Sequence, residues 1–276
     1  MSKKEFVESY ENRKKRRGDR PDGYRVRNLD SMHVLMPHLM PHRTLNEAVL
    51  TEVFDLTKVN GYIAMKNSDN PEFKYTFFHF ITAAMAKVMT MRPAMNYFIE
   101  GHHLYERKRL SFSFVVKRKF ALGSPESIAI IRMDRDSAEP PIEQVYRKVK
   151  DFVYSVRNEG KQESTSDDLD ILAKFPRFML KIIFFFLRRF NYYGIIPKFI
   201  QNSDPDCSSC FISNLGSIKM SANYHHLAEW GTNSFFTVIN QKKMRPFFNS
   251  DGSYEMRDSL DMSFTIDERL ADGFYF

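Results

Sequence analysis

The sequence predicts a single α/β domain, a two-layer α+β sandwich in which helices flank a mixed β-sheet. Strand and helix patterns alternate along the chain, beginning with a strand at residues 48–59 and a helix at residues 77–91. No internal repeat or low-complexity tract interrupts this order. A chain of 276 residues is long enough to bury one large core or two modest ones.

The first strong pattern is the strand at residues 48–59. Its side chains alternate between two faces, and β-branched and aromatic residues dominate, which is typical of strands. Asn70 and Pro71 end this region. Residues 77–91 then carry apolar side chains at helical spacing, and Pro93 ends the predicted helix.

Several shorter patterns follow. Residues 103–107 and 110–116 predict a hairpin-like pair of strands, and residues 127–133 predict another strand. Residues 140–157 have one apolar side and predict an amphipathic helix. Residues 158–168 are polar and predict a loop.

The chain is basic, with a formal net charge of +7. Such a charge attracts anions in general, including phosphates, nucleic acid and membrane surfaces, without choosing among them. Residues 1–30 form a basic N-terminal arm, which we interpret as a solvated tail without a specific partner rather than a binding segment. We do not expect nucleic acid as a partner.

The cysteines, the N-terminal residues and the apolar stretches indicate the cellular compartment of the protein. The N-terminus lacks the apolar core of a signal peptide, and no stretch approaches the ~20 uncharged apolar residues that span a bilayer. Cys207 and Cys210 provide no disulfide framework and only a weak zinc signal. We therefore expect a cytoplasmic protein without a metal site, in which these cysteines precede or start a buried strand.

Residues 171–190 are strongly apolar but carry regularly spaced cations. Lys174, Arg177, Lys181 and Arg188 share one helical face. One interpretation is a core helix with a solvated basic edge, which is the commoner use of such helices. The other is an interfacial helix that lies on anionic lipid or binds an acyl chain, making the protein peripheral to a membrane.

Several segments resemble a known enzyme family in the same order along the chain. Residues 267–273 read DERLADG, which fits an Asp-x-Arg-x-x-Asp-Gly pattern, and residues 211–216 read FISNLG. Residues 50–59, 77–116 and 234–246 fit the same family. The chain thus resembles the acyltransferase core of 2-oxo acid dehydrogenase complexes and chloramphenicol acetyltransferase. The resemblance covers about residues 45–276, with a helical insertion near 165–205.

This resemblance implies a chloramphenicol acetyltransferase-like fold for residues 31–276. It also implies a homotrimer whose active sites lie between subunits, with a coenzyme A thioester as substrate and no tightly bound cofactor. No segment resembles a lipoyl or subunit-binding domain, so we do not expect a dehydrogenase-complex core. Family members continue past the Asp-Gly pair into a final helix, whereas this sequence ends at Phe276.

The resemblance also assigns site residues. In the family a serine hydroxyl stabilises the tetrahedral oxyanion, and Ser213 matches that serine. Asp272 matches an aspartate that holds the active-site loop through an arginine, here expected near Arg25 or Arg27. Asn214, Gly216 and Trp230 are the residues expected to border the substrate.

The family's general base is a histidine, but Glu268 occupies that position here. A glutamate with a reference pKa of ~4.3 could serve only if burial raised its pKa by about two units. The apolar neighbours Ile266, Leu270 and Phe274 make a dry pocket around it conceivable. The competing interpretation is a structural carboxylate paired with an arginine.

A second candidate for the base lies at His225 and His226, shortly after Ser213 in the sequence. We hypothesise that one of them forms a relocated acid–base pair with Glu268, oriented by Glu229 or by Glu268 itself. Isolated histidines are more often packing or surface residues, which is the plainer interpretation.

The sequence therefore favours an acyltransferase that moves an acyl group between coenzyme A and an unidentified small acceptor. The main alternative is a catalytically inactive relative that binds a ligand or serves assembly. A third alternative is a peripheral membrane protein that contacts anionic lipid through residues 171–190.

Overall fold

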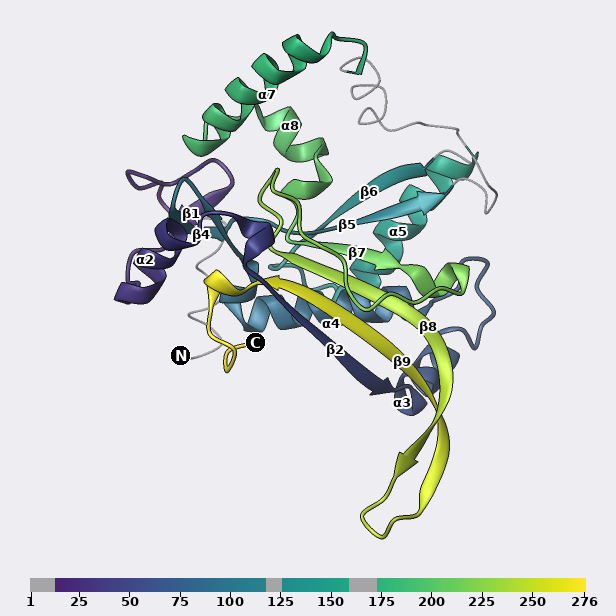
Figure 1. The fold of residues 1–276 in the computed structure, drawn as a ribbon. Helices are drawn as coiled ribbons and strands as arrows, with labels where there is room; N and C mark the ends of the chain where they lie inside the picture. Colours follow the sequence, from purple (N-terminus) through teal and green to yellow (C-terminus); the bar gives the residue numbers. More distant parts are fainter. Residues whose placement is uncertain (1–12, 118–125, 159–172) are drawn as a thin grey trace.

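The computed structural model describes residues 13–117, 126–158 and 173–276, whose arrangement is shown in Figure 1. The strands are β1 (Gly23–Arg25), β2 (Glu47–Asp55), β3 (Tyr97–Glu100), β4 (His103–Arg107), β5 (Leu110–Lys117), β6 (Glu126–Met133), β7 (Cys210–Asn214), β8 (Phe235–Phe248) and β9 (Tyr254–Asp267). The helices are α2 (Ser31–Leu39), α3 (Thr57–Lys66), α4 (Phe77–Met91), α5 (Pro141–Asn158), α7 (Arg177–Tyr192) and α8 (Lys198–Ser203). Short 3-10 turns, including η4 (Leu215–Ile218) and η5 (Glu268–Leu270), complete the fold.

The main sheet has six strands in the order β2-β9-β8-β7-β5-β6, and a smaller sheet has the order β1-β4-β3. In the main sheet β7 runs parallel to β5 and β8, whereas the other neighbours are antiparallel. Helices α4 and α5 cover one face of the main sheet and share its apolar core (Figure 1). The predicted mixed sheet with flanking helices is therefore confirmed.

Strand alternation gives the main sheet two different faces. Cys210 and Ile212 of β7 are buried in the core with α4 and α5, and Cys210 starts that strand as predicted. Phe211 packs instead in a separate cluster with Phe236 and Val238 of β8. We call this side of the main sheet, opposite α4 and α5, the open face. Ser213 shares it because it follows Phe211 by two residues.

Some predicted elements are confirmed and others need correction. Helix α4 has the predicted bounds, and β6 and α5 lie within one residue of theirs. The strand expected at residues 48–59 ends at Asp55, because its carboxylate accepts hydrogen bonds from the backbone N–H and hydroxyl of Thr57 at 2.8 and 2.6 Å. These bonds favour the turn that begins α3, a helix that the alternating pattern concealed.

The predicted hairpin of residues 103–107 and 110–116 is wrong, although both strands exist. β4 pairs with β1 and β3 in the small sheet, whereas β5 pairs with β6 and β7 in the main sheet. β5 forms an eight-residue ladder with β6, which satisfies its backbone groups away from β4. The loop predicted at residues 158–168 lies almost entirely outside the described residues.

The basic arm expected at residues 1–30 is anchored to the body at several described positions, although the side chains of residues 13–18 are exposed. Arg20 is buried, pairs with Asp22 at 2.9 Å and donates a hydrogen bond to the Asn191 side chain at 2.9 Å. Arg13 forms an ion pair of 2.7 Å with Glu106 of β4. These contacts, together with the pairing of β1 with β4, fix residues 13–25 as part of the fold rather than as a solvated tail.

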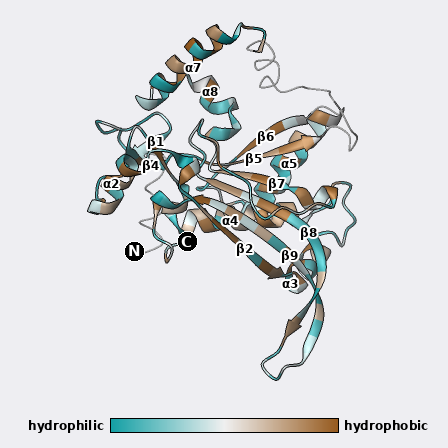
Figure 2. Ribbon diagram, in the orientation of Figure 1, coloured by the Kyte–Doolittle hydropathy of each residue, from teal (hydrophilic) through white to brown (hydrophobic). Residues whose placement is uncertain are grey.

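The expected insertion contains α7 and α8, and α7 stands away from the sheets at the top of Figure 1. Apolar and polar residues are interspersed along α7 (Figure 2). Side chains from Arg177 to Phe190 are exposed or partly exposed, and Asn191 is buried against Arg20. No helix in the described part of the chain combines the length and hydrophobicity needed to cross a bilayer.

Candidate active site

Ser213 lies on the open face between two parallel neighbours. Its register partner on β8 is Val238, and its side chain is partly exposed. Among the residues that the structure describes, none accepts a hydrogen bond from the Ser213 hydroxyl or donates one to it. A hydroxyl on a rigid strand with no protein partner can donate to an oxygen atom of a bound molecule.

His225 covers the open face beside this serine. Its ring stacks on Phe236 with a centroid distance of 4.2 Å and an interplanar angle of 5°, and Phe236 stacks on Phe211 at 5.0 Å. The three rings form one stack, so His225 lies roughly 9 Å from Phe211, and Ser213 is about 7 Å further along β7, which places His225 roughly 11 Å from Ser213. The structure therefore brings His225 and Ser213 to one surface of the same chain.

Ser213 and Glu268 do not meet within one chain. Ser213 is in register with Val238, and Val238 with Ser263 of β9. Glu268 follows Ser263 by five residues, which is roughly 17 Å along the strand, and two strand spacings add about 10 Å across the sheet. The separation of roughly 20 Å means that only an assembly of subunits could bring these two residues together.

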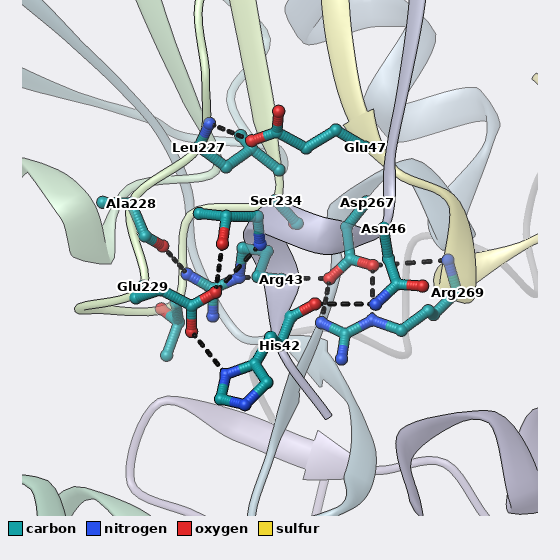
Figure 3. Close-up of polar contacts among 12 residues, drawn as sticks. His42, Arg43, Asn46, Glu47, Leu227, Ala228, Glu229, Ser234, Asp267 and Arg269 are labelled. Carbon is teal, nitrogen blue, oxygen red and sulfur yellow. Dashed lines mark hydrogen bonds and ion pairs between the residues drawn. The ribbon is translucent and has the colours of Figure 1, made fainter. Parts of the chain in front are cut away.

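Asp267 is the acid of the C-terminal motif that forms a structural ion pair, as Figure 3 shows. Its carboxylate is fully buried and accepts hydrogen bonds from Arg269 at 2.8 and 2.7 Å. The guanidinium of Arg43 lies 3.9 Å from the same carboxylate and donates to the carbonyls of Ala228 and Gly231. Through Arg269 and Arg43, Asp267 thus connects the end of β9 to the loops at residues 40–43 and 228–231.

Glu268 is held outward by these buried neighbours. Its backbone N–H donates to the Asn46 carbonyl at 3.0 Å, while its side chain is exposed between Asp267 and Arg269. Phe274, expected to help form a dry pocket, is fully exposed. The predicted apolar pocket around Glu268 is therefore wrong for the single chain, because the turn η5 directs Asp267 and Arg269 inward and Glu268 outward.

Asp272 plays a different part from the one expected. Its carboxylate accepts a hydrogen bond from the Tyr275 backbone at 2.9 Å, and its side chain is exposed. The expected partners are engaged elsewhere, since Arg25 contacts His103 at 3.1 Å and Arg27 donates to the Arg17 carbonyl at 2.7 Å. The predicted Asp272–arginine pair is absent from the described residues, and Arg269 with Asp267 holds this turn instead.

Glu229 does not orient His225 or His226. Its carboxylate accepts hydrogen bonds from the backbone and hydroxyl of Thr44 at 2.9 and 2.6 Å, and lies 3.7 Å from His42. These contacts, partly visible in Figure 3, close the loop over residues 42–44. The expected role of Glu229 is wrong because it points toward this loop, while both histidine rings are exposed and lie near each other.

The residues expected to border the substrate have clear structural contacts. A side chain at Gly216 would place its Cβ 2.5 Å from the Asn240 carbonyl oxygen, so this close approach requires glycine. The carbonyl of Asn214 accepts a hydrogen bond of 2.7 Å from Ser217, which closes the turn η4. Trp230 donates its indole N–H to Asp204 and contacts Phe184 of α7 edge to face.

Asp206 is a titratable group that sequence reasoning missed. Burial, followed by the neighbouring Asp204 carboxylate, raises the pKa of Asp206 to about 6, and the charges of Arg43 and His226 oppose this shift. Asp206 therefore lies near His226 and can exchange a proton close to neutral pH. Its position just before Cys207 carried no recognisable motif. In the described residues no three acidic, histidine or cysteine side chains gather as metal ligands would.

Comparisons with known proteins identify solved structures that share this fold. No protein-family model matches the sequence, and no curated protein matches it at a significant level. A solved structure of a probable dihydrolipoamide acetyltransferase from Listeria monocytogenes 4b F2365 is 16% identical, covers 92% of this chain and 89% of its own, and has a TM-score of 0.56.

Two further solved structures give the same result. The dihydrolipoamide acetyltransferase of Azotobacter vinelandii, investigated for the roles of a serine, a histidine and an asparagine in its mechanism, is 14% identical over 91% of this chain and 86% of its own, with a TM-score of 0.56. A chloramphenicol acetyltransferase is 11% identical over 92% and 94%, with a TM-score of 0.53. At these identities the likeness establishes the fold: the chain has the chloramphenicol acetyltransferase-like fold expected from its sequence.

Proposed function

We propose that the protein transfers an acyl group from a coenzyme A thioester to a small hydroxyl, amine or thiol acceptor. The observation that carries this proposal is the Ser213 hydroxyl, which has no hydrogen-bond partner among the described residues and lies on the open face of an acetyltransferase-like fold. Coenzyme A enters as a substrate, and no tightly bound cofactor takes part. The two free cysteines suit a reducing compartment, so the cytoplasm is the proposed location.

In the proposed mechanism the acceptor atom attacks the thioester carbonyl and forms a tetrahedral oxyanion. The Ser213 hydroxyl donates a hydrogen bond to that oxyanion, an interaction that strengthens as negative charge develops. Collapse of the intermediate releases the coenzyme A thiolate, which takes up the proton removed from the acceptor. Asn214, Gly216 and Trp230 border the space for the acyl carrier in this proposal.

The proton acceptor proposed for this reaction is Glu268 of an adjacent subunit. Because Ser213 and Glu268 are roughly 20 Å apart within one chain, such a site requires two subunits, and a homotrimer is the assembly that the resemblance implies. A subunit interface would cover the exposed Glu268 and supply the burial that raises a carboxyl pKa toward neutrality. Asp267 with Arg269 fixes where Glu268 emerges, whereas Asp272 closes only the turn at residues 272–275.

His225 and His226 are the competing proton acceptors, and His225 has the better position. It stacks over the open face on the same chain as Ser213, whereas the His226 ring adjoins it at 4.8 Å. A histidine base would need no contribution from another subunit. Replacing Glu268 or both histidines separately therefore distinguishes a shared site from a single-chain site.

The test is acyl transfer from acetyl-coenzyme A and longer acyl-coenzyme A thioesters to a panel of small acceptors. The reaction is monitored through the free coenzyme A thiol that it releases. Ser213→Ala should lower kcat by about 10²–10³, the usual effect of removing one oxyanion donor. Ser68→Ala, at an exposed serine beyond α3, is the matched control and should leave kcat unchanged. Coenzyme A binding without turnover by the intact protein would instead support an inactive, ligand-binding relative.

We also propose that the protein contacts an anionic membrane surface through the predicted segment 171–190, of which the structure describes residues 173–190, including most of α7. Five apolar side chains lie along one side of the helix and remain substantially exposed: Phe178, Ile182, Phe185, Phe186 and Phe190. Their spacings of four, three, one and four residues are those of a single helical face. Phe178 and Phe185 are 64% and 65% exposed, so little of this surface packs on the body.

The charge of α7 matches the proposed surface. Arg177, Lys181, Arg188 and Arg189 are its cations, Lys174 lies three residues before it, and residues 173–193 contain no Asp or Glu. An apolar stripe beside a cationic edge can lie in the headgroup region, with roughly 1 kcal/mol gained per cation near an anionic surface. The helix would then attach the enzyme to the membrane without spanning it.

Co-sedimentation with vesicles containing phosphatidylserine tests this second proposal. Lys181→Gln with Arg188→Gln should weaken binding roughly thirtyfold, the equivalent of about 2 kcal/mol, and Phe178→Ser with Phe185→Ser should weaken it at least as much. Phe248→Ser removes an equally exposed phenylalanine from the β8–β9 hairpin and should have no effect. Equal binding to neutral vesicles, or a change in oligomeric state with these α7 variants, would contradict a membrane role.

A further inference from the structure

A cationic cavity lies apart from the candidate active site, between α8, the start of β5 and the end of β6. Its volume is about 200 Å³. Four cationic side chains and two acidic ones line it: Arg107, Lys108, Arg109, Arg132, Asp22 and Asp204. The lining therefore has an excess of positive charge, which concentrates anions in a partly enclosed space.

Both acids of the lining already have other partners. Asp22 accepts a pair of hydrogen bonds from Arg20 at 2.9 and 3.2 Å. Asp204 accepts the indole N–H of Trp230 and the backbone N–H of Asp206. Among the described residues neither carboxylate forms an ion pair with a cation of the cavity. The charge of Asp22 acts on Arg107 and Lys108, but four cations against two acids leave an excess of positive charge.

Arg109 and Arg132 meet at a single neutral residue. The guanidinium of Arg109 donates to the side-chain oxygen of Asn202 at 2.8 Å, and that of Arg132 donates to the Asn202 carbonyl at 3.2 Å. Burial, and then the charge of Arg109, lower the pKa of Arg132, which shows that the two cations are close. Within the described chain neither arginine has a carboxylate partner. Two adjacent guanidinium groups thus retain most of their donors for an anion.

Two buried donors beside the cavity also lack acceptors. Arg107 is 3% exposed, and its guanidinium bonds to neutral oxygens of Cys207 and Thr232. The Nε atom of Arg107 and the Nε2 atom of Gln201 are buried without a hydrogen-bond partner in the described structure. An unpaired buried cation is costly, and a bound anion in the adjoining cavity would offset that cost.

We propose that this cavity binds a phosphate group, held chiefly by Arg109 and Arg132. Guanidinium groups match the oxygens of a phosphate in paired, charge-assisted hydrogen bonds, and phosphate can accept from several donors at once. The cavity is smaller than the 300–1,000 Å³ typical of sites for whole small molecules, so it suits the phosphate end of a larger compound. The site stands on its own observations and does not require acyl transfer.

Asn202→Asp is the sharpest test of this site. The substitution keeps the shape of the side chain and places a carboxylate against Arg109 and near Arg132, so that an internal anion takes the place of phosphate. It should weaken phosphate binding at least about tenfold, the loss expected when one charge-assisted contact is removed. Because it adds an ion pair at an exposed position, the fold should be retained, as far-UV circular dichroism would show.

Two further variants complete the design. Arg109→Gln removes one guanidinium and should also weaken binding about tenfold. Lys58→Gln removes the same charge from an exposed position on α3 and should leave phosphate affinity unchanged within about twofold. This control separates a specific site from the general attraction of a basic protein for anions.

Binding is measured by calorimetry with sodium phosphate, against sodium chloride at equal ionic strength. Coenzyme A compared with dephospho-coenzyme A, and glycerol 3-phosphate compared with glycerol, then identify the source of the phosphate. Tighter binding of either phosphorylated compound, lost in Asn202→Asp, supports the proposal and names the source. Phosphate binding that is indistinguishable from chloride, or equal in the intact protein and both cavity variants, would overturn it.

Discussion

Replacing Asp267 by Asn should destabilise the protein strongly, because this carboxylate is the anchor of the C-terminal turn. It is fully buried, accepts hydrogen bonds from Arg269 at 2.8 and 2.7 Å and lies 3.9 Å from Arg43. The amide leaves two buried guanidinium groups without a counter-charge. Breaking a buried pair in this way costs about 3–5 kcal/mol, and the residual amide oxygen favours the lower end, about 3 kcal/mol.

The measurement is thermal and urea unfolding of Asp267→Asn beside Asp272→Asn. A loss of about 3 kcal/mol corresponds to a fall in Tm of roughly 6–12 °C for a chain of this size. Asp272 is exposed and accepts one hydrogen bond that Asn can also accept, so its variant should stay within about 0.5 kcal/mol. Equal stability of the two variants would refute the assignment of Asp267, rather than Asp272, as the structural acid.

Three other stability predictions follow from particular contacts. Gly216→Ala should cost about 2 kcal/mol or more, because its Cβ would lie 2.5 Å from a backbone oxygen; an unchanged urea midpoint would show that this approach relaxes freely. Gly61→Ala, in the middle of α3 with no atom within 4 Å of the added Cβ, should raise stability by about 0.5–1 kcal/mol, and a loss would contradict that open surface. Burial lowers the pKa of His79 to about 4, so the unfolded state binds a proton first as the pH falls. The contribution of His79 to the free energy of unfolding is complete above about pH 6.5 and declines by about 3 kcal/mol between about pH 6.5 and 4. His79→Gln should flatten that decline in stability, and identical stability–pH profiles of the variant and the intact protein would refute this prediction.

The sequence predicted the fold well because its strongest signals are local. The apolar repeat of α4 and the alternation of β6 are complete within single elements, and packing confirmed both. Pairing between strands is not local, so the sequence could not show that β4 and β5 belong to different sheets. The helix α3 was hidden because its first residues, 57–59, continue the alternating sequence pattern of β2. The chain nevertheless turns before them, at Asp55.

The candidate site was predicted less completely. The FISNLG segment placed Ser213 on an accessible strand face, but the sequence assigned the arginine partner of the C-terminal turn to the wrong acid. Asp267 and Arg269 are two residues apart and both turn inward, whereas spacing alone cannot show which motif residues face solvent. The contacts of Glu229 with Thr44 join segments about 185 residues apart, which no local pattern reveals.

The most direct test of the proposed shared active site is complementation between two inactive variants. Ser213→Ala and Glu268→Gln subunits, co-expressed with different tags and purified as mixed assemblies, would contain some interfaces with an intact serine and an intact glutamate. When the two variants are present in equal amounts, the probability that an interface combines an intact Ser213 with an intact Glu268 is one half times one half. About a quarter of the wild-type acyl-transfer activity should therefore return. Mixed assemblies that remain as inactive as either variant alone would contradict a site built from Ser213 of one subunit and Glu268 of the next.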